Sequence, residues 1–463
     1  MLEQLFKLKE HNTTVKTEIL AGITTFMTMA YILAVNPTTM TAFNDILQLP
    51  ADAQMNPRGV FLATALASFI GTLLMAFLAN YPFALAPGMG LNALFSYTVV
   101  IRYGYSWKVA LTAVFVEGII FILLSLTNVR EAIFNSIPQT LKYAVSCGIG
   151  LFIAFIGLQN AHIVIGDQNV LVALYSFSKE TFHTTGIGVI LALFGVLITS
   201  ILLVKRVKGG ILIGILITWV LGIICELTGI YVVDIDARYY SMIPDFSGGL
   251  HLDALGDVAF KVDFKNILSM DFVVIIFSFL FVDMFDTLGT LIGVSSKANM
   301  LDKDGKLPKI KGALLADAIA TTAGALLGTS TTTTYVESAT GVSEGGRTGL
   351  TAVVTALLFG ISVFLSPVFI AIPSFATAPA LIVVGFYMMG SVVKINFEDM
   401  TEGIPAFICI IAMPFMYSIS EGISLGIISY VLINVLCGKF KEKKISLLMI
   451  ILAILFVLKY CLL

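Results

Sequence analysis

Charged residues are scarce in this chain. Of 463 residues, 12% are Asp, Glu, Lys or Arg, whereas 58% are hydrophobic, and the formal net charge is −2. A chain this apolar has more hydrophobic surface than one soluble core can bury, which excludes an ordinary soluble domain. The near-neutral balance gives no reason to expect nucleic acid or a strongly acidic ligand as a partner. The composition therefore predicts a protein embedded in a lipid bilayer.

Cysteine and histidine are also too few and too scattered to suggest a site. The five cysteines lack disulfide or zinc-ligand spacing, and the four histidines lie in loops or flanks rather than in helical pairs. We therefore expect no disulfide framework, no metal site and no cofactor. We also expect no cleavable signal peptide, because the N-terminus is charged and the first apolar run lacks a small-residue cleavage site. Residues 1–16 should remain on the cytoplasmic side.

Long apolar runs are abundant. A helix needs about 20 residues to cross the hydrocarbon core of a bilayer. Clear runs of this kind lie near 60–79, 109–127, 187–204, 209–229, 272–294, 350–372 and 376–393. Weaker or interrupted runs lie near 17–36, 84–101, 138–157, 312–345 and 404–437. We expect an all-α polytopic membrane protein of the plasma membrane with 14 transmembrane segments.

Basic clusters set the expected orientation. The clusters near 205–208, 297–311 and 439–444 all fall on the cytoplasmic side if the segments alternate from a cytoplasmic N-terminus. The expected order is seven segments in 17–229, an extracytoplasmic linker in 230–270, seven segments in 271–437, and a basic C-terminal segment in 438–463. That last segment ends in an apolar helix, and its path across or along the membrane is left open.

An internal repeat links the two halves. Residues 58–90 align with 311–343 at a constant offset of 253, and the alignment includes three glycine pairs. Seven expected crossings separate the two copies, and because seven is odd the copies must run in opposite directions. The sequence thus predicts a seven-plus-seven inverted repeat. Such repeats are typical of secondary transporters, whose substrate site lies near the midplane where broken segments of the two halves meet.

Both copies are interrupted at corresponding places. The first contains NYPFALAPGMGLN (80–92), and the second contains GTSTTTTYVESATGVSEGG (328–346). Proline, glycine and β-branched threonine all oppose a regular helix. Non-helical backbone at membrane depth must be buried in protein or line a wet cavity. We therefore expect 83–90 and 328–346, with Thr334 and Glu337, to form opposite walls of a substrate cavity; the alternative is that 328–346 is an external loop.

Two further acids lie in the apolar stretch FVDMFDTLGTLIG (281–293). Asp283 and Asp286 are three residues apart, so they share one helix face. A charge at the bilayer centre costs roughly 2.5–3.5 kcal/mol even on the mildest scale, so such residues usually have a function. At the offset of 253 the counterparts of Asp283 and Glu337 are alanines, so the acids belong to one half only. Glu117 and Asp317 are expected to be structural hydrogen-bonding partners between helices.

These carboxylates suit a neutral planar ligand. Ionised carboxylates only accept hydrogen bonds, so adjacent N–H donors, as in a nucleobase, fit them better than an anion does. Asp283 lies deeper in the apolar run, and we expect it to flank the ligand and to carry a proton together with Glu337. Asp286, one turn on, should orient the ligand or brace the unwound segment. A membrane aspartyl protease is disfavoured, because paired catalytic aspartates should come from different segments; we expect no enzyme.

Four long motifs resemble those of one transporter family. They are TEILAGITTFMTMAYILAVNP (17–37), ALAPGMGLNALF (84–95), DMFDTLGTLIGV (283–294) and TTTTYVESATGVSEGGRTGL (331–350). Together they are similar to the nucleobase–cation symporter-2 family, and within it to the azaguanine-like branch of guanine, hypoxanthine and adenine permeases. The xanthine and uracil branch remains an alternative, although it differs from TYVES at this place. Anion carriers of the same fold are a second alternative, but an anion site should be basic or neutral.

The resemblance implies both fold and mechanism. It implies a core domain and a gate domain, with short strands interrupting the third and tenth segments. It also implies uptake of purine bases driven by the proton gradient. By matching motif, the implied substrate-binding residues are Asp283, Asp286, Glu337 and Asn92. The preferred purine, the proton stoichiometry and a homodimeric assembly are left open.

Overall fold

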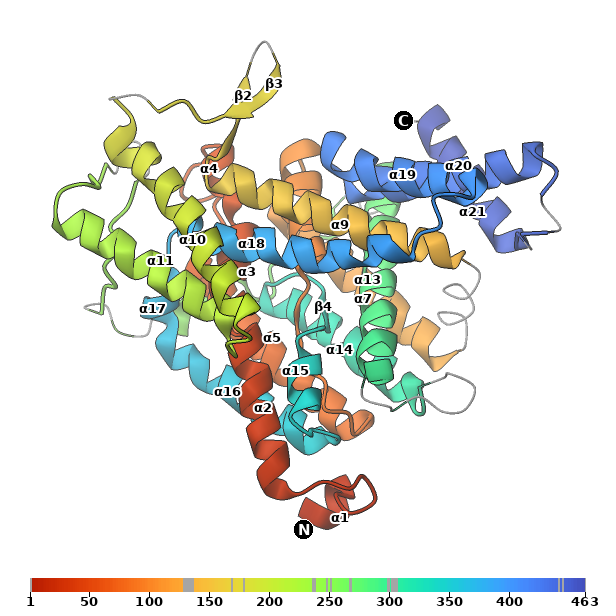
Figure 1. The fold of residues 1–463 in the computed structure, drawn as a ribbon, viewed down its shortest axis with the longest axis horizontal. Helices are drawn as coiled ribbons and strands as arrows, with labels where there is room; N and C mark the ends of the chain where they lie inside the picture. Colours follow the sequence, from red (N-terminus) through yellow and green to blue (C-terminus); the bar gives the residue numbers. More distant parts are fainter. Residues whose placement is uncertain are drawn as a thin grey trace.

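The computed structural model describes residues 2–462 apart from 128–136, 168–169, 178–179, 235–238, 247–248, 250–251, 266–268, 298–299, 301–306, 440–441 and 444. The described chain is mainly helical, and its helices pack as two groups (Figure 1). Ten of the described helices are long and apolar enough to cross a membrane. The expected helical membrane fold is therefore confirmed, whereas the count of 14 segments and their inverted topology stay predictions.

The first group, here called the core group, contains both broken segments. Its first-half elements are α2 (Val15–Met29), α3 (Ile32–Met40), α5 (Pro57–Leu78), β1 (Leu85–Pro87), α6 (Met89–Ala93), the π-helical η1 (Leu94–Arg102) and α7 (Trp107–Leu126). Its second-half elements are α13 (Met270–Lys297), α14 (Ile310–Leu327), β4 (Thr332–Thr334), α15 (Ser338–Ser343) and α16 (Gly349–Ser362). Helix α14 packs against both α5 and α7, and α16 packs against both α2 and α5. The two halves are thus interleaved rather than side by side.

The second group, the gate group, flanks the first. It consists of α9 (Gln139–Asn160), α10 (Ile187–Val204), α11 (Gly210–Leu227), α18 (Ser374–Met389), α19 (Met400–Phe415) and α20 (Ile419–Leu436). Helices α9 and α18 lie side by side across the middle of Figure 1, and α19 packs against α9 and α20. The C-terminal α21 (Leu447–Leu462) packs against α20. The division matches the core and gate expected from the resemblance.

Short elements connect these helices. They are α1 (Leu2–Phe6), α4 (Ala42–Ile46), the hairpin of β2 (Val164–Asp167) and β3 (Leu171–Leu174), η2 (Phe182–Gly186), η3 (Leu252–Ala254), α12 (Leu255–Val258), η4 (Val363–Leu365), α17 (Ser366–Ile370) and η5 (Gly390–Lys394). The β2–β3 hairpin projects from the bundle at the top of Figure 1. The basic clusters expected at 297–311 and 439–444 lie partly outside the described residues.

Polar side chains define where several of these helices begin. The Asn56 side chain accepts hydrogen bonds from the backbone N–H groups of residues 58 and 59, and Pro57 occupies the first turn of α5. Ser106 caps α7 and Ser418 caps α20 in the same way. Such caps satisfy backbone donors that have no partner within the helix. These caps therefore determine the residue at which each of these long apolar helices begins.

The interrupted segments meet in a small antiparallel sheet. Leu85 of β1 pairs with Thr334 of β4, Ala86 with Thr333, and Pro87 with Thr332. All six residues are buried. The strands expected in the third and tenth segments are therefore present, and they pair with each other across the two halves of the chain.

The repeat offset changes at this point. Helices α5 and α14 begin at residues 57 and 310, in agreement with the offset of 253, but the strands begin at 85 and 332. The second copy is six residues shorter here, because α14 is shorter than α5 and its link to the strand is also shorter. A Cβ at Gly71 would lie 2.8 Å from the Cβ of Ala320, so this glycine is needed where α5 crosses α14. The ungapped alignment thus holds for the helices and fails beyond them.

Candidate functional site

Backbone hydrogen bonds hold the two strands together and extend beyond them. The Tyr335 N–H donates to the Ala84 carbonyl at 3.0 Å, and the Gly88 N–H donates to the Thr331 carbonyl at 3.0 Å. On the other side of β1, the Thr72 hydroxyl accepts from the Leu85 N–H at 2.9 Å and donates to its carbonyl at 3.1 Å. Non-helical backbone can lie within a membrane protein because its polar groups are satisfied in this way.

Glu337 lies directly after this sheet, at the start of α15. Its side chain is partly buried, and Oε1 accepts a hydrogen bond of 2.8 Å from the Tyr31 hydroxyl. Tyr31 sits between α2 and α3 and is fully buried. The Tyr31 hydroxyl, at the break between α2 and α3, therefore contacts Glu337, which the sequence predicted as a site residue in the tenth segment.

Asp286 approaches the same region from α13. Its side chain is partly buried, and a Cβ added at Gly88 would lie 3.3 Å from its Oδ2. The same Cβ would lie 2.7 Å from Cγ2 of Thr333. Gly88 therefore leaves room for a carboxylate next to the strand pair, at the start of α6.

Asp283, one turn earlier on α13, occupies a different environment. It is fully buried, and its Oδ1 accepts a hydrogen bond of 2.9 Å from the Thr287 hydroxyl. The oxygen of Thr287 also lies 2.9 Å from Oδ1 of Asp317 on α14 and 2.6 Å from the hydroxyl of Thr333 on β4. This cluster ties α13, α14 and β4 together, and Asp317 makes the interhelical contact expected of it.

Asn92 and Thr334 also lie beside the strands. Asn92, on α6, is fully buried, and its side-chain oxygen accepts a hydrogen bond from the Ser330 hydroxyl. It therefore connects the helix after β1 to the segment before β4. The Thr334 hydroxyl is buried and has no hydrogen-bond partner among the residues that the structure describes. Thr334 thus has a free donor and acceptor at the end of the sheet.

Glu117 braces the entry to β4. Its Oε2 accepts a hydrogen bond of 2.7 Å from the Thr331 hydroxyl, and the residue is fully buried on α7. The contact is of the structural kind expected for this acid. It also shows how the run of threonines is used, because Thr331 and Thr333 bond to neighbouring helices through their side chains.

Three residues of this region were missed from the sequence: Tyr31, Asn36 and Thr72. Asn36 on α3 donates to the Thr64 hydroxyl at 2.6 Å and to the Thr329 hydroxyl at 2.9 Å. A buried amide in the apolar run AYILAVNP is a polar exception that could have marked it. Tyr31 and Thr72 give no such signal, because tyrosine and threonine are ordinary in apolar helices.

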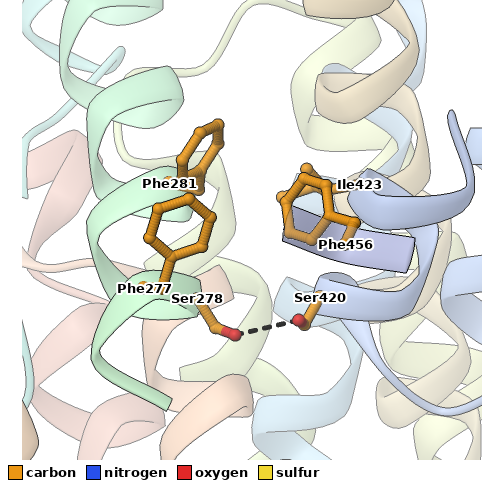
Figure 2. Close-up of a pocket in the computed structure, with 6 residues that line it drawn as sticks. All are labelled: Phe277, Ser278, Phe281, Ser420, Ile423 and Phe456. Atoms are coloured by element: carbon orange, nitrogen blue, oxygen red, sulfur yellow. Dashed lines mark hydrogen bonds between the residues drawn. The ribbon is translucent and has the colours of Figure 1, made fainter. Parts of the chain in front are cut away.

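A separate small cavity has none of these acids in its lining. Figure 2 shows its lining, Phe277, Ser278 and Phe281 of α13 facing Ser420 and Ile423 of α20 and Phe456 of α21. The Ser278 hydroxyl donates to the Ser420 hydroxyl at 2.8 Å. The centre of a water molecule could occupy about 10 Å³ of this cavity, whereas pockets for small organic ligands are far larger. We therefore exclude it as the substrate site and assign it to the packing of α21.

Together these observations define a class of protein. A bundle of apolar helices, two broken segments paired across the halves, and acidic side chains gathered beside them are the features of a multi-pass membrane transporter. A sequence profile described as "Permease family" matches residues 16–425. The chain belongs to this family of permeases and is a transporter rather than an enzyme.

Individual relatives cover almost the whole chain. A putative permease of Methanocaldococcus jannaschii is 46% identical over 459 residues, covering 99% of this chain and 98% of the relative. The guanine/hypoxanthine permease PbuO of Bacillus subtilis is 44% identical over 460 residues, with 98% of each covered. The adenine permease AdeQ of Escherichia coli is 40% identical over 459 residues, covering 99% of this chain and 96% of the relative.

Solved structures support the fold at lower identity. The transmembrane domain of the cyanobacterial bicarbonate transporter BicA has a TM-score of 0.58 at 16% identity, covering 88% of this chain and 97% of that one. The murine anion transporter solute carrier 26 family member A9, in its inward-facing state, has a TM-score of 0.59 at 13% identity, covering 92% of this chain and 68% of that one. At these identities the likeness concerns the fold alone.

Proposed function

We propose that this permease imports purine nucleobases across the plasma membrane by proton symport, with its N-terminus in the cytoplasm. Guanine and hypoxanthine are the first candidates, and adenine is a further one. The observation that carries the proposal is the pair of partly buried carboxylates, Asp286 and Glu337, beside the β1–β4 sheet. The names of the relatives support the substrate class, because they include permeases for adenine and for guanine and hypoxanthine.

Each proposed site residue has a distinct role. Glu337 and Asp286 accept hydrogen bonds from N–H groups of the base, since ionised carboxylates are acceptors only. The Thr334 hydroxyl supplies a neutral donor or acceptor at the end of β4. Asp283 lies one turn before Asp286 on α13 and accepts a hydrogen bond from Thr287. Asn92, on α6, accepts a hydrogen bond from Ser330 and so connects the two broken segments. We propose that Asp283 and Glu337 take up and release the transported proton at other steps of the cycle, and that Glu337 and Asp286 are ionised while the base is bound.

The acids also argue against the other candidates. A carboxylate-lined site repels an anion, so the similarity in fold to anion carriers does not carry over to substrate. The motif TYVES (334–338) resembles the guanine, hypoxanthine and adenine branch rather than the xanthine and uracil branch. These alternatives can be separated by one transport measurement, because the substrates can be offered as competitors.

The test is uptake into proteoliposomes that contain the purified full-length chain. An inward proton gradient should drive accumulation of labelled guanine, hypoxanthine or adenine, and a protonophore should abolish it. Unlabelled guanine, hypoxanthine and adenine should compete, whereas xanthine, uracil, sulfate and bicarbonate should not. Asp283→Asn should lose accumulation but retain exchange of internal for external base. Purine transport that does not depend on the proton gradient would refute symport. Competition by an anion, with no competition by the purines, would refute the purine assignment.

A further inference from the structure

Tyr31 has no role in the proposed function. It stands at the break between α2, which ends at Met29, and α3, which begins at Ile32. Its side chain is fully buried, and its hydroxyl donates a 2.8 Å hydrogen bond to Oε1 of Glu337. Among the described residues, it is the one side chain that donates to this carboxylate. A phenol buried at a helix break and directed at a site carboxylate calls for a specific explanation.

Contacts between α2 and the α15–α16 segment fix Tyr31 relative to Glu337. One turn before Tyr31, the Thr28 hydroxyl lies 2.9 Å from the Thr340 hydroxyl of α15. A Cβ on Gly341 would lie 2.6 Å from the Ala21 carbonyl oxygen, so α15 lies directly on α2. Because α2 and α15 pack this closely, the distance between the Tyr31 hydroxyl and the Glu337 carboxylate can vary little.

Glu18 anchors the other end of α2. Its fully buried carboxylate accepts hydrogen bonds from the hydroxyls of Thr348, at 2.8 Å, and Thr351, at 2.6 Å. It also accepts from the backbone N–H groups of residues 347, 348 and 351. Helix α2 is thus attached near both of its ends to the segment that follows Glu337 in the chain. The Tyr31 contact is therefore part of a fixed arrangement rather than a chance approach of two side chains.

We propose that Tyr31 is a positioning residue for Glu337 in purine binding; this rests on the proposed function. A hydrogen bond to a carboxylate is directional, so the phenol fixes the plane of the carboxylate and occupies one acceptor position of Oε1. Oε2 then keeps its acceptor positions for an N–H group of the base. Because the phenol donates to Glu337, it also favours the acceptor form of the carboxylate that the base requires. Tyr31 itself need not touch the substrate.

Tyr31→Phe is the direct test, with Tyr81→Phe as the matched control. Tyr81 is also buried, but its hydroxyl has no hydrogen-bond partner among the described residues. Tyr31→Phe should raise the KM for purine uptake about tenfold and leave the maximal rate nearly unchanged, as expected for loss of ground-state binding. Tyr81→Phe should leave both values unchanged. A normal KM in Tyr31→Phe protein of normal membrane abundance would overturn the proposal.

A double substitution separates positioning from direct contact. If Tyr31 acts through Glu337, Tyr31→Phe should add no loss of affinity to Glu337→Gln, so the two effects should not multiply. Independent, multiplying effects would show that Tyr31 acts elsewhere, and would overturn the proposal.

Infrared difference spectroscopy gives a readout that needs no substrate. The carboxylate band that disappears in Glu337→Gln should shift in Tyr31→Phe and stay in place in Tyr81→Phe. If Tyr31→Phe is not recovered from the membrane, Glu337→Gln should instead shift a tyrosine C–O band relative to the unmodified protein. An unmoved band refutes the Tyr31–Glu337 coupling, whereas a shifted band in a protein that transports no purine refutes the proposed function alone.

Discussion

The two broken segments each contain a three-residue strand, but the side chains of the two strands differ in polarity. In the first, β1 consists of Leu85, Ala86 and Pro87, whereas in the second β4 consists of three threonines. They form one antiparallel pair, so each strand supplies backbone hydrogen-bond partners for the other. The difference teaches that both segments supply a strand to the pair, whereas the strand threonines and Glu337 belong to the second segment only.

The way each strand is held follows the same division. Helix α5 holds β1 through backbone atoms, because both hydrogen bonds of the Thr72 side chain go to Leu85 N–H and C=O. By contrast, β4 and the residue before it are held mainly through side chains, with Thr331 bonded to Glu117 and Thr333 to Thr287, and one longer bond reaches a β4 carbonyl. Substitutions in the two segments should therefore affect different properties, and that expectation can be tested.

The largest expected effect is on substrate affinity, from Glu337→Gln in the polar segment. The amide keeps the shape of the side chain but replaces an acceptor oxygen with a donor, so it opposes an N–H of the base. Loss of a hydrogen bond to a charged group should weaken purine binding by about 1.5–3 kcal/mol, measured by competition in proteoliposomes.

Glu344→Gln is the control for this substitution. Glu344 ends the same helix but pairs with Lys208 at 2.6 Å, and both side chains are substantially exposed. Exposed ion pairs contribute little, so purine affinity should be unchanged. Equal losses of affinity in the two variants, or none in Glu337→Gln, would remove Glu337 from the site.

An intermediate effect is expected on stability, from Thr72→Val beside the apolar segment. The substitution leaves the buried N–H of Leu85 without its partner, which should lower the free energy of unfolding by about 1–3 kcal/mol. Thr321→Val is the comparison beside the polar segment, where one longer hydrogen bond of 3.2 Å to the Thr332 carbonyl is lost. Thermal unfolding in detergent should show the larger loss for Thr72→Val, and the reverse order would contradict the proposed difference between the strands.

The smallest expected effect on stability is from Thr334→Val at the end of β4. Its hydroxyl has no partner among the described residues, so unfolding should change by no more than about 0.5 kcal/mol. If the hydroxyl contacts the base, affinity should nevertheless fall by about 0.5–1.5 kcal/mol. Binding and unfolding measured on the same preparation would distinguish the two; a large loss of stability would show that the hydroxyl has a structural role.

Much of this architecture could be predicted from the sequence because it follows from strong local signals. Apolar runs identified the helices, and the prolines, glycines and threonines of 80–92 and 328–346 identified both breaks. The family motifs predicted strands at those breaks. Asp283, Asp286 and Glu337 were identifiable because charge is rare in apolar surroundings.

Other features could not be predicted, because they depend on contacts between distant parts of the chain. The strand register departs from the repeat offset by six residues, since helix and link lengths differ between the copies. Tyr31 and Glu337 are 306 positions apart, and no local pattern connects them. The different surroundings of Asp283 and Asp286 also depend on residues of α14, β4 and α6, which only the fold brings to α13.

The strand pair also has a consequence for the order of events during synthesis. Leu85 enters the growing protein about 250 residues before its partner, Thr334. Until then, the backbone groups of β1 that face β4 have no protein partner, and lipid cannot supply one. The backbone groups of β1 that face β4 therefore gain their partners only after β4, in the second half of the chain, has been synthesised.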